Sequence, residues 1–209
     1  LDYGVSEVIG DRAYHRDPEV VSRLAVACMQ GMRTGGMAAT AKHFPGHGAV
    51  VADSHKALPI DRRPLTELTD ELLPYRRMIT NGLTSVMVAH VLFPAVDEAP
   101  AGFSARWIQQ ELRGNLGFTG AVFSDDLSMG GAAFAGTVPE RARRALAAGC
   151  DMLLHCNGKL DEMREVAAAS VELKGKALRR AKAALKSARK PQPFDRKAAL
   201  KDLAALVSE

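Results

Sequence analysis

Residues 38–48 read Ala-Ala-Thr-Ala-Lys-His-Phe-Pro-Gly-His-Gly, a short apolar run that ends in lysine and histidine before a Pro-Gly turn. This run predicts a β-strand over Ala38–His43. Three later runs also predict strands, and they are nearly continuous in apolar residues, as expected when both faces of a sheet are covered: Ser85–His90, Ala121–Asp125 and Asp151–His155. The strands begin about 30 to 50 residues apart, which is the spacing of βα units. The sequence therefore predicts an α/β fold with a parallel sheet.

Helices are expected between these strands, and several of them have recognisable boundaries. The run Asp-Pro-Glu at 17–19 offers an N-cap, a proline in the first turn and an acid near the helix start, and the glycine pair at 35–36 ends that helix. Pro74 is expected to start the next helix after a less regular stretch. Ser104 and Thr137 are expected to cap two further helices.

Polar side chains gather where two of the predicted strands end. Lys42 and His43 close the first strand, and the loop after it carries Asp-Ser-His at 53–55. Ser-Asp-Asp at 124–126 ends the third strand. The carboxyl ends of parallel strands are where α/β barrels place their chemistry, and a lysine fits poorly in an apolar core. These runs therefore predict a functional site at this edge of the sheet.

Together, the two clusters resemble the bacterial exo-β-N-acetylglucosaminidases of glycoside hydrolase family 3. The resemblance implies a (β/α)8 TIM barrel, but four strands do not close one, and such a barrel takes about 250 residues. The chain would hold only the second half, strands 5–8, with Leu1 and Asp2 as the last residues of strand 4. We expect residues 1–190 to be the C-terminal half of a TIM-barrel catalytic domain. Residues 191–209 are expected to be a linker and a final helix that packs on the barrel.

The resemblance also implies catalytic roles. A retaining glycosidase needs a nucleophilic carboxylate and a proton donor near the leaving oxygen. Asp125 matches the family nucleophile, with Asp126 as the alternative. His55 would move the proton and Asp53 would hold its ring. A histidine titrates near pH ~6.5, so it can both give and take a proton at neutral pH.

The family's residues that bind sugar hydroxyls resemble Arg12, Lys42 and His43 of this sequence. Arg12 could instead form an ordinary surface ion pair. We interpret His47 as part of the loop scaffold, and His90 either as a polar residue near the pocket or as a buried, hydrogen-bonded histidine. The resemblance implies no cofactor and no metal ion.

The implied reaction is removal of terminal non-reducing β-N-acetylglucosamine from a saccharide. The implied setting is the recycling of peptidoglycan fragments, the GlcNAc-1,6-anhydro-MurNAc peptides, in the cytoplasm. A histidine would avoid the repulsion that an ionised glutamate would feel beside the carboxylate of muramic acid. The residues do not distinguish this substrate from chitobiose, and they do not indicate the oligomeric state.

Three other interpretations remain open at this point. The first is a metal-dependent hydrolase, because four residues have side chains that bind zinc: His43, His47, Asp53 and His55. Their spacing matches no HExxH-type pattern. The second is a family 3 β-glycosidase of broad specificity, although such enzymes lack the Asp-Ser-His run. The third is an inactive fragment or a binding scaffold.

Composition and charge limit the number of domains and the kinds of partner that are expected. The chain has 209 residues, of which 47% are hydrophobic, and a net charge of +4, so one domain with a sizeable core is expected. It is basic from Lys174 to Lys201, but residues 174–190 hold no aromatic side chain for base stacking. We therefore expect no nucleic-acid partner, and an amphipathic helix there with Leu178 and Leu185 facing the barrel.

Membrane and export signals are not expected either. No apolar run approaches the ~20 residues that span a bilayer, and the opening Leu-Asp-Tyr-Gly lacks the positive charge of a secretory leader. The three cysteines form no CxxC pair, and we expect Cys28 and Cys150 to be buried thiols in a reducing cytoplasm.

Overall fold

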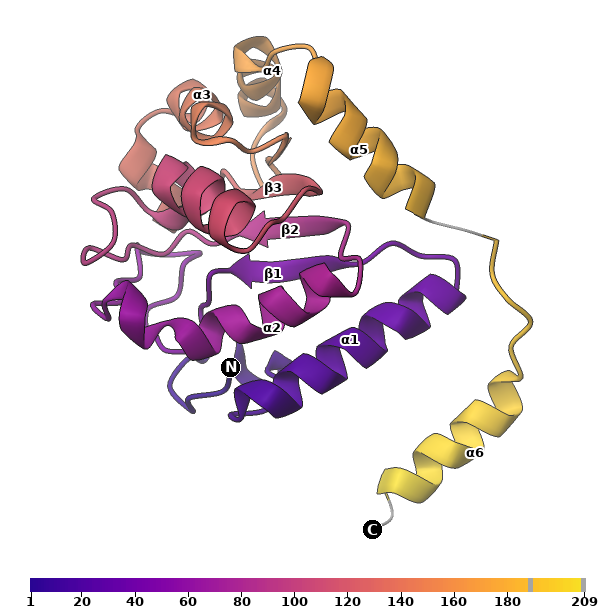
Figure 1. Cartoon of the computed structure of the whole chain (residues 1–209). Helices are drawn as coiled ribbons and strands as arrows, with labels where there is room; N and C mark the ends of the chain where they lie inside the picture. Colours follow the sequence, from indigo (N-terminus) through magenta and orange to yellow (C-terminus); the bar gives the residue numbers. More distant parts are fainter. Residues whose placement is uncertain (188–189, 208–209) are drawn as a thin grey trace.

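The computed structural model describes residues 1–187 and 190–207, and a four-stranded parallel sheet forms its core (Figure 1). The strands follow one another in sequence order, and their bounds are β1 (Thr40–Phe44), β2 (Ser85–Val88), β3 (Ala121–Asp126) and β4 (Met152–Leu154). All three strand pairs are parallel. Helices connect consecutive strands, which is the arrangement of half a (β/α)8 barrel. The predicted fold class is confirmed.

All four predicted strands are present, with boundaries that differ by at most two residues. Ser85 of β2 pairs with Thr40 of β1 on one side and with Ala121 of β3 on the other. Val86 and Val88 are completely buried, because β2 has strands on both sides and helices over the sheet. The nearly continuous apolar run at β2 in the sequence therefore correctly predicted a strand inside the sheet.

The helices lie along the outside of the sheet. In Figure 1, α1 and α2 lie side by side near β1, and α3 and α4 lie side by side beyond β3. The longer helices are α1 (Pro18–Thr34), α2 (Thr69–Thr80), the π-helix η4 (Arg106–Asn115), α3 (Val138–Ala148), α4 (Leu160–Ala169), α5 (Gly175–Ser187) and α6 (Arg196–Val207).

The expected caps form at three helices. Asp17 Oδ1 accepts a hydrogen bond of 2.8 Å from the amide of Glu19, at the start of α1. Ser104 Oγ accepts one of 3.0 Å from the amide of Trp107. Thr137 forms a capping box with the third residue of α3. Each cap pairs an amide that the helix itself leaves without an acceptor.

The predicted start of a helix at Pro74 is wrong. Helix α2 begins at Thr69, after a short 3-10 turn at Leu65–Glu67, and Pro74 lies inside it. Pro74 is the sixth residue of α2, so the helix loses the hydrogen bond to the carbonyl four residues earlier, and the proline ring crowds that carbonyl. Burial of Leu72, Pro74 and Tyr75 stabilises the helix despite that loss.

Trp107 is at the centre of the aromatic packing. Its side chain is completely buried, with ring centroids 5.9 Å from Phe44 and 5.1 Å from Phe93. Phe44 ends β1, so the indole of η4 supports the end of the strand that carries Lys42 and His43.

The C-terminal helices differ in part from expectation. Arg180 of α5 pairs with buried Asp151 at 3.0 Å, and Leu178 is half-buried. Leu185 is 76% exposed, so its predicted packing on the barrel is wrong. Helix α6 stands apart from the sheet, with exposed side chains at 200–205 (Figure 1). The domain division at residue 190 and the packing of the final helix stay predictions.

The expected burial of two cysteines is correct for one of them, and the expected absence of a membrane-spanning helix can be compared with the helices described. Cys150 is buried as expected, but Cys28 is exposed, because the face of α1 that carries it opens onto a cavity instead of packing against a strand. Among residues 1–187 and 190–207, the helices are too short or too polar to cross a membrane.

Candidate active site

Asp126, the second acid of the Ser-Asp-Asp run, has both carboxylate oxygens engaged. Oδ1 accepts hydrogen bonds of 2.9 Å from the amides of Ser128 and Cys156. Oδ2 accepts bonds of 2.7 Å from Ser128 Oγ and 2.9 Å from Asn157 Nδ2. Burial alone would raise the pKa of this carboxyl, but the four donors outweigh it and hold the pKa below its usual value. Asp126 thus links the ends of β3 and β4.

Asp125, the first acid, has fewer partners. It is 8% exposed, and its Oδ1 accepts a hydrogen bond of 2.8 Å from the amide of Asp126. Its Oδ2 lies 3.8 Å from Nε2 of His43. One oxygen is therefore oriented by the backbone, and the other faces the end of β1.

His43 is kept neutral by its surroundings. Burial lowers the pKa of its imidazole to about 4, although the nearby charge of Asp125 acts in the opposite direction. The positive charges of Lys42 and Arg12 lower it further. A neutral imidazole can donate one hydrogen bond and accept another, which suits a side chain that binds hydroxyl groups.

The pKa of His43 predicts a loss of stability in mild acid. In the unfolded chain a histidine binds its proton below about pH 6.5, whereas folded His43 stays neutral down to about pH 4. The unfolded state then binds more protons, so stability falls as the pH falls through this window. Between pH 7 and pH 5 the contribution of His43 is about 2 kcal/mol of unfolding free energy.

Urea unfolding at pH 7 and pH 5 measures this effect, with His43→Gln as the comparison. The glutamine keeps a polar side chain but does not titrate, so the difference between the two pH values should shrink by about 2 kcal/mol. An unchanged difference would show that His43 takes up its proton without unfolding.

Asp53 and His55 form a pair in the loop after β1. The imidazole Nδ1 of His55 lies 2.8 Å from Asp53 Oδ1, which also accepts a hydrogen bond of 2.9 Å from the His55 amide. These bonds lower the pKa of the Asp53 carboxyl. Because the carboxylate engages Nδ1, it leaves Nε2 of the exposed ring available for proton transfer.

The loop that carries this pair is fixed at several points. Ser54 is buried, and its Oγ lies 2.9 Å from Nε2 of His47. Its carbonyl oxygen accepts a bond of 2.9 Å from the amide of Gly131, and the carbonyl of His55 accepts one of 2.9 Å from the amide of Gly130. The loop after β1 is thus bonded to the segment that follows Asp125.

A cavity of about 350 Å³ opens beside β1, between that strand and helices α1 and α2. The three predicted sugar ligands Arg12, Lys42 and His43 line it together with His47. Arg12 also donates a hydrogen bond to the carbonyl of Val8. The structure therefore brings the predicted ligands to one cavity. Its lining does not include the predicted catalytic residues, which are Asp53, His55 and Asp125.

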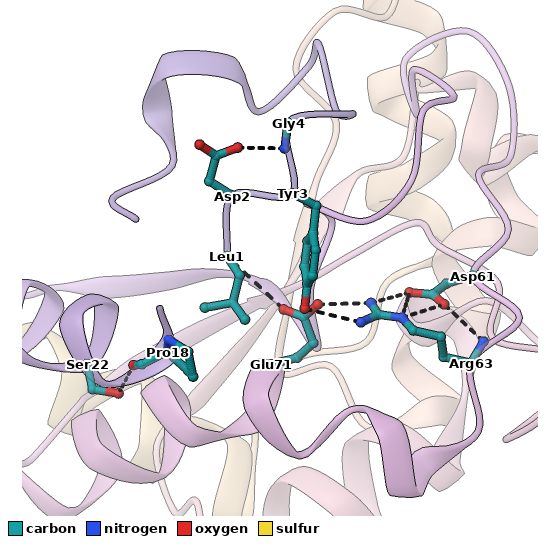
Figure 2. A network of polar contacts seen from close by, with 9 residues as sticks. All are labelled: Leu1, Asp2, Tyr3, Gly4, Pro18, Ser22, Asp61, Arg63 and Glu71. Carbon is teal, nitrogen blue, oxygen red and sulfur yellow. Dashed lines mark hydrogen bonds and ion pairs between the residues drawn. The ribbon is translucent and has the colours of Figure 1, made fainter. Parts of the chain in front are cut away.

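The sequence did not predict an ionic cluster (Figure 2) whose Glu71 also lines this cavity. Nη2 of Arg63 lies 2.6 Å from Oδ2 of Asp61 and 2.9 Å from Oε1 of Glu71, and Nη1 donates to the hydroxyl of Tyr3 at 3.2 Å. The two carboxylates raise the pKa of Arg63 above its usual value. Glu71 lies one helical turn from buried Leu68, so its carboxylate is on an apolar face. A charged residue in such a position needs a partner, and this is the feature of the sequence that could have predicted the cluster.

His90 is a buried, hydrogen-bonded histidine, one of the two interpretations above. It is completely buried, and its ring stacks on that of Phe103 with the centroids 5.2 Å apart. Burial lowers its pKa, so the ring is neutral. Nε2 can then donate to the carbonyl of Asp126, 3.2 Å away.

The possible zinc ligands do not form a cluster. In the part of the chain that the structure describes, no group of three or more His, Cys, Asp or Glu side chains is placed to hold a metal ion.

The chain is similar to known proteins over most of its length. A β-hexosaminidase of Thiobacillus denitrificans is 60% identical over 158 residues, which are 75% of this chain and 44% of that protein. A β-hexosaminidase of Nitrosospira multiformis is 56% identical over 75% of this chain and 45% of its own length. The chain thus spans less than half the length of these curated relatives.

Among solved structures, NagZ from Neisseria gonorrhoeae in complex with N-trifluoroacetyl-D-glucosamine matches with a TM-score of 0.79. It is 45% identical and covers 88% of this chain and 53% of its own. The profile of the glycosyl hydrolase family 3 N-terminal domain matches residues 4–188. The family suggested by the Asp-Ser-His and Ser-Asp-Asp runs is therefore confirmed, and the chain belongs to glycosyl hydrolase family 3.

Proposed function

We propose that this protein is part of a retaining β-N-acetylglucosaminidase that removes terminal non-reducing GlcNAc from peptidoglycan fragments. One observation carries the proposal: the loop of the Asp53–His55 pair is hydrogen-bonded, through the carbonyls of residues 54 and 55, to the amides of residues 131 and 130, which follow soon after Asp125. A candidate proton donor and a candidate nucleophile therefore belong to one connected site. A retaining glycosidase needs these two groups.

In the first step, a carboxylate oxygen of Asp125 attacks the anomeric carbon of the bound sugar. The bond from that carbon to the leaving oxygen breaks, and the leaving oxygen takes a proton from Nε2 of His55. The product is a glycosyl ester on Asp125. Asp53 holds the Nδ1 proton, and its charge stabilises the imidazolium before the transfer.

In the second step, neutral His55 accepts a proton from a water molecule through Nε2. The oxygen of that water forms a bond to the anomeric carbon, and the ester bond to Asp125 breaks. The sugar leaves with its original β configuration, and His55 is again protonated. Asp126 would hold the ends of β3 and β4 in place through its four hydrogen bonds.

The substrate proposal rests on the ligands and the relatives. Arg12, Lys42 and His43 offer polar groups at one cavity, where they would bind sugar hydroxyls. The gonococcal NagZ structure holds an N-acylated glucosamine, which favours an N-acetyl sugar here. Peptidoglycan recycling in the cytoplasm is the setting we propose, because a histidine acid/base tolerates the carboxylate of a muramic acid aglycone.

The test uses this chain and a fusion protein, in which the upstream residues of the Thiobacillus denitrificans relative precede Leu1. The fusion protein should hydrolyse an aryl β-N-acetylglucosaminide, with β-GlcNAc as the first product by NMR. If the fusion protein hydrolyses an aryl β-glucoside equally fast, a β-glycosidase of broad specificity is favoured instead. No turnover in the fusion protein would favour an inactive scaffold.

A mechanism-based fluorosugar should label Asp125 of the fusion protein, because the fluorine slows hydrolysis of the glycosyl ester. Peptide mass spectrometry identifies the labelled residue. Asp126 serves as the internal control, since it is adjacent in sequence but has all of its acceptor positions engaged by donors. A label on Asp126, or α-GlcNAc as the first product, would refute the assignment.

A further inference from the structure

We propose that Gly130 and Gly131 form a backbone clamp that positions the proton-transferring loop against the nucleophile. The inference rests on the proposed function for His55 and Asp125. The two glycines come soon after β3 and begin the short 3-10 helix Gly130–Ala135. They are positioning residues, because they would act on the reaction only through the placement of His55.

The clamp consists of two main-chain hydrogen bonds between segments that are distant in sequence. The amide of Gly130 donates to the carbonyl of His55, and the amide of Gly131 donates to the carbonyl of Ser54, both at 2.9 Å. The side chain of His55 itself is 57% exposed, so packing does little to hold it. The position of its ring therefore depends on the backbone of the loop.

The same segment is also fixed to the nucleophile. The carbonyl of Asp126 accepts a bond of 3.2 Å from the amide of Met129, and Nε2 of His90 lies 3.2 Å from the same oxygen. The amide of Asp126 in turn donates to Asp125 Oδ1 at 2.8 Å. A continuous path of hydrogen bonds and a few peptide units thus connects the carboxylate of Asp125 to the backbone of His55.

Space requires glycine at position 130 and favours it at position 131. A Cβ on Gly130 would lie 2.5 Å from the carbonyl carbon and oxygen of Lys56 and 3.0 Å from the carbonyl oxygen of His55. These are backbone atoms, so the loop itself would have to move. A Cβ on Gly131 would lie 3.1 Å from the carbonyl oxygen of Ser54 and 3.1 Å from Cβ of His90, a tighter contact than usual but a smaller clash.

The test is Gly130→Ala, with Gly131→Ala as a milder variant and Gly31→Ala as the matched control. Gly31 lies on the exposed side of α1, and nothing lies within 4 Å of a Cβ added there. Hydrogen exchange on this chain measures the clamp without any activity. The amide of Gly131 should exchange about tenfold faster or more in Gly130→Ala, because the bonds between the two segments are lost.

The second readout is the dependence of rate on the leaving group, measured in the fusion protein. Gly130→Ala should slow turnover of a sugar aglycone by about 10- to 100-fold and change that of a dinitrophenyl glycoside much less, since displacement weakens proton transfer. Gly131→Ala should show the same pattern with a smaller effect, and Gly31→Ala should resemble wild type.

The two readouts separate the possible failures. Unchanged exchange in Gly130→Ala, or an equal loss of rate for every leaving group, would overturn the clamp. If Gly130→Ala does not fold, Gly131→Ala decides by the same two measurements. Faster exchange in a fusion protein that hydrolyses no glycoside would overturn the proposed function and leave the clamp in place.

Discussion

Replacing Asp125 by alanine is expected to lower turnover of the fusion protein by about 10³-fold or more, since loss of a group that forms the covalent intermediate removes the main reaction path. The fold should survive, because the backbone hydrogen bond that the carboxylate accepts comes from the adjacent residue Asp126. Aryl glycoside kinetics and a thermal melt measure the two effects. A variant that retains more than about a tenth of wild-type activity would refute Asp125 as nucleophile.

Asp126→Ala is the control for this result. It would remove the acceptor of the donors on Ser128, Cys156 and Asn157, and the loss of each hydrogen bond costs about 1 kcal/mol. Its main effect should therefore be a lower melting temperature. Asp125→Ala should melt close to wild type. Loss of Asp125 should therefore lower mainly the activity, and loss of Asp126 mainly the stability.

His55→Ala is expected to change the dependence of rate on the leaving group. A sugar aglycone departs as a strongly basic alkoxide and needs a proton, so its release should slow by about 10²–10⁴-fold. Dinitrophenolate leaves almost without protonation, and glycosylation with it should be far less affected. The second step still needs His55 as a base, so a rapid burst of dinitrophenol followed by slow turnover is expected. Stopped-flow absorbance measures both phases.

Asp53→Ala provides the graded comparison. It removes the carboxylate that lies 2.8 Å from Nδ1 of His55 but keeps the imidazole, so it should give a weaker version of the same pattern. An equal loss of rate for every leaving group in His55→Ala would mean that His55 binds the sugar or holds the loop.

The strands and most of the helix starts could be predicted from the sequence because their signals are local. Asp17 and Thr137 cap helices within three residues of themselves, and the run before Asp125 is apolar enough for an inner strand. The start of α2 could not be predicted from Pro74, because the local preference of proline for a helix start is outweighed by the burial of the α2 face.

The candidate site could be predicted only where its motifs are contiguous. The choice between Asp125 and Asp126 depends on donors at Cys156 and Asn157, about 30 positions later, which no local pattern indicates. The backbone clamp could not be found either, because a glycine pair in a loop most often marks a turn. Its partner carbonyls are on a different loop, and only the three-dimensional structure brings them together.

The position of Trp107 gives this protein a built-in optical probe. The chain has one tryptophan, and its buried indole contacts Phe44, the residue directly after His43. Its fluorescence emission will therefore shift to longer wavelength when the carboxyl end of β1 loosens and water reaches the indole. In an acid titration, an emission shift that coincides with the loss of unfolding free energy would locate the first opening at this end of the sheet. A shift that lags behind it would place the first opening elsewhere, without any label added to the protein.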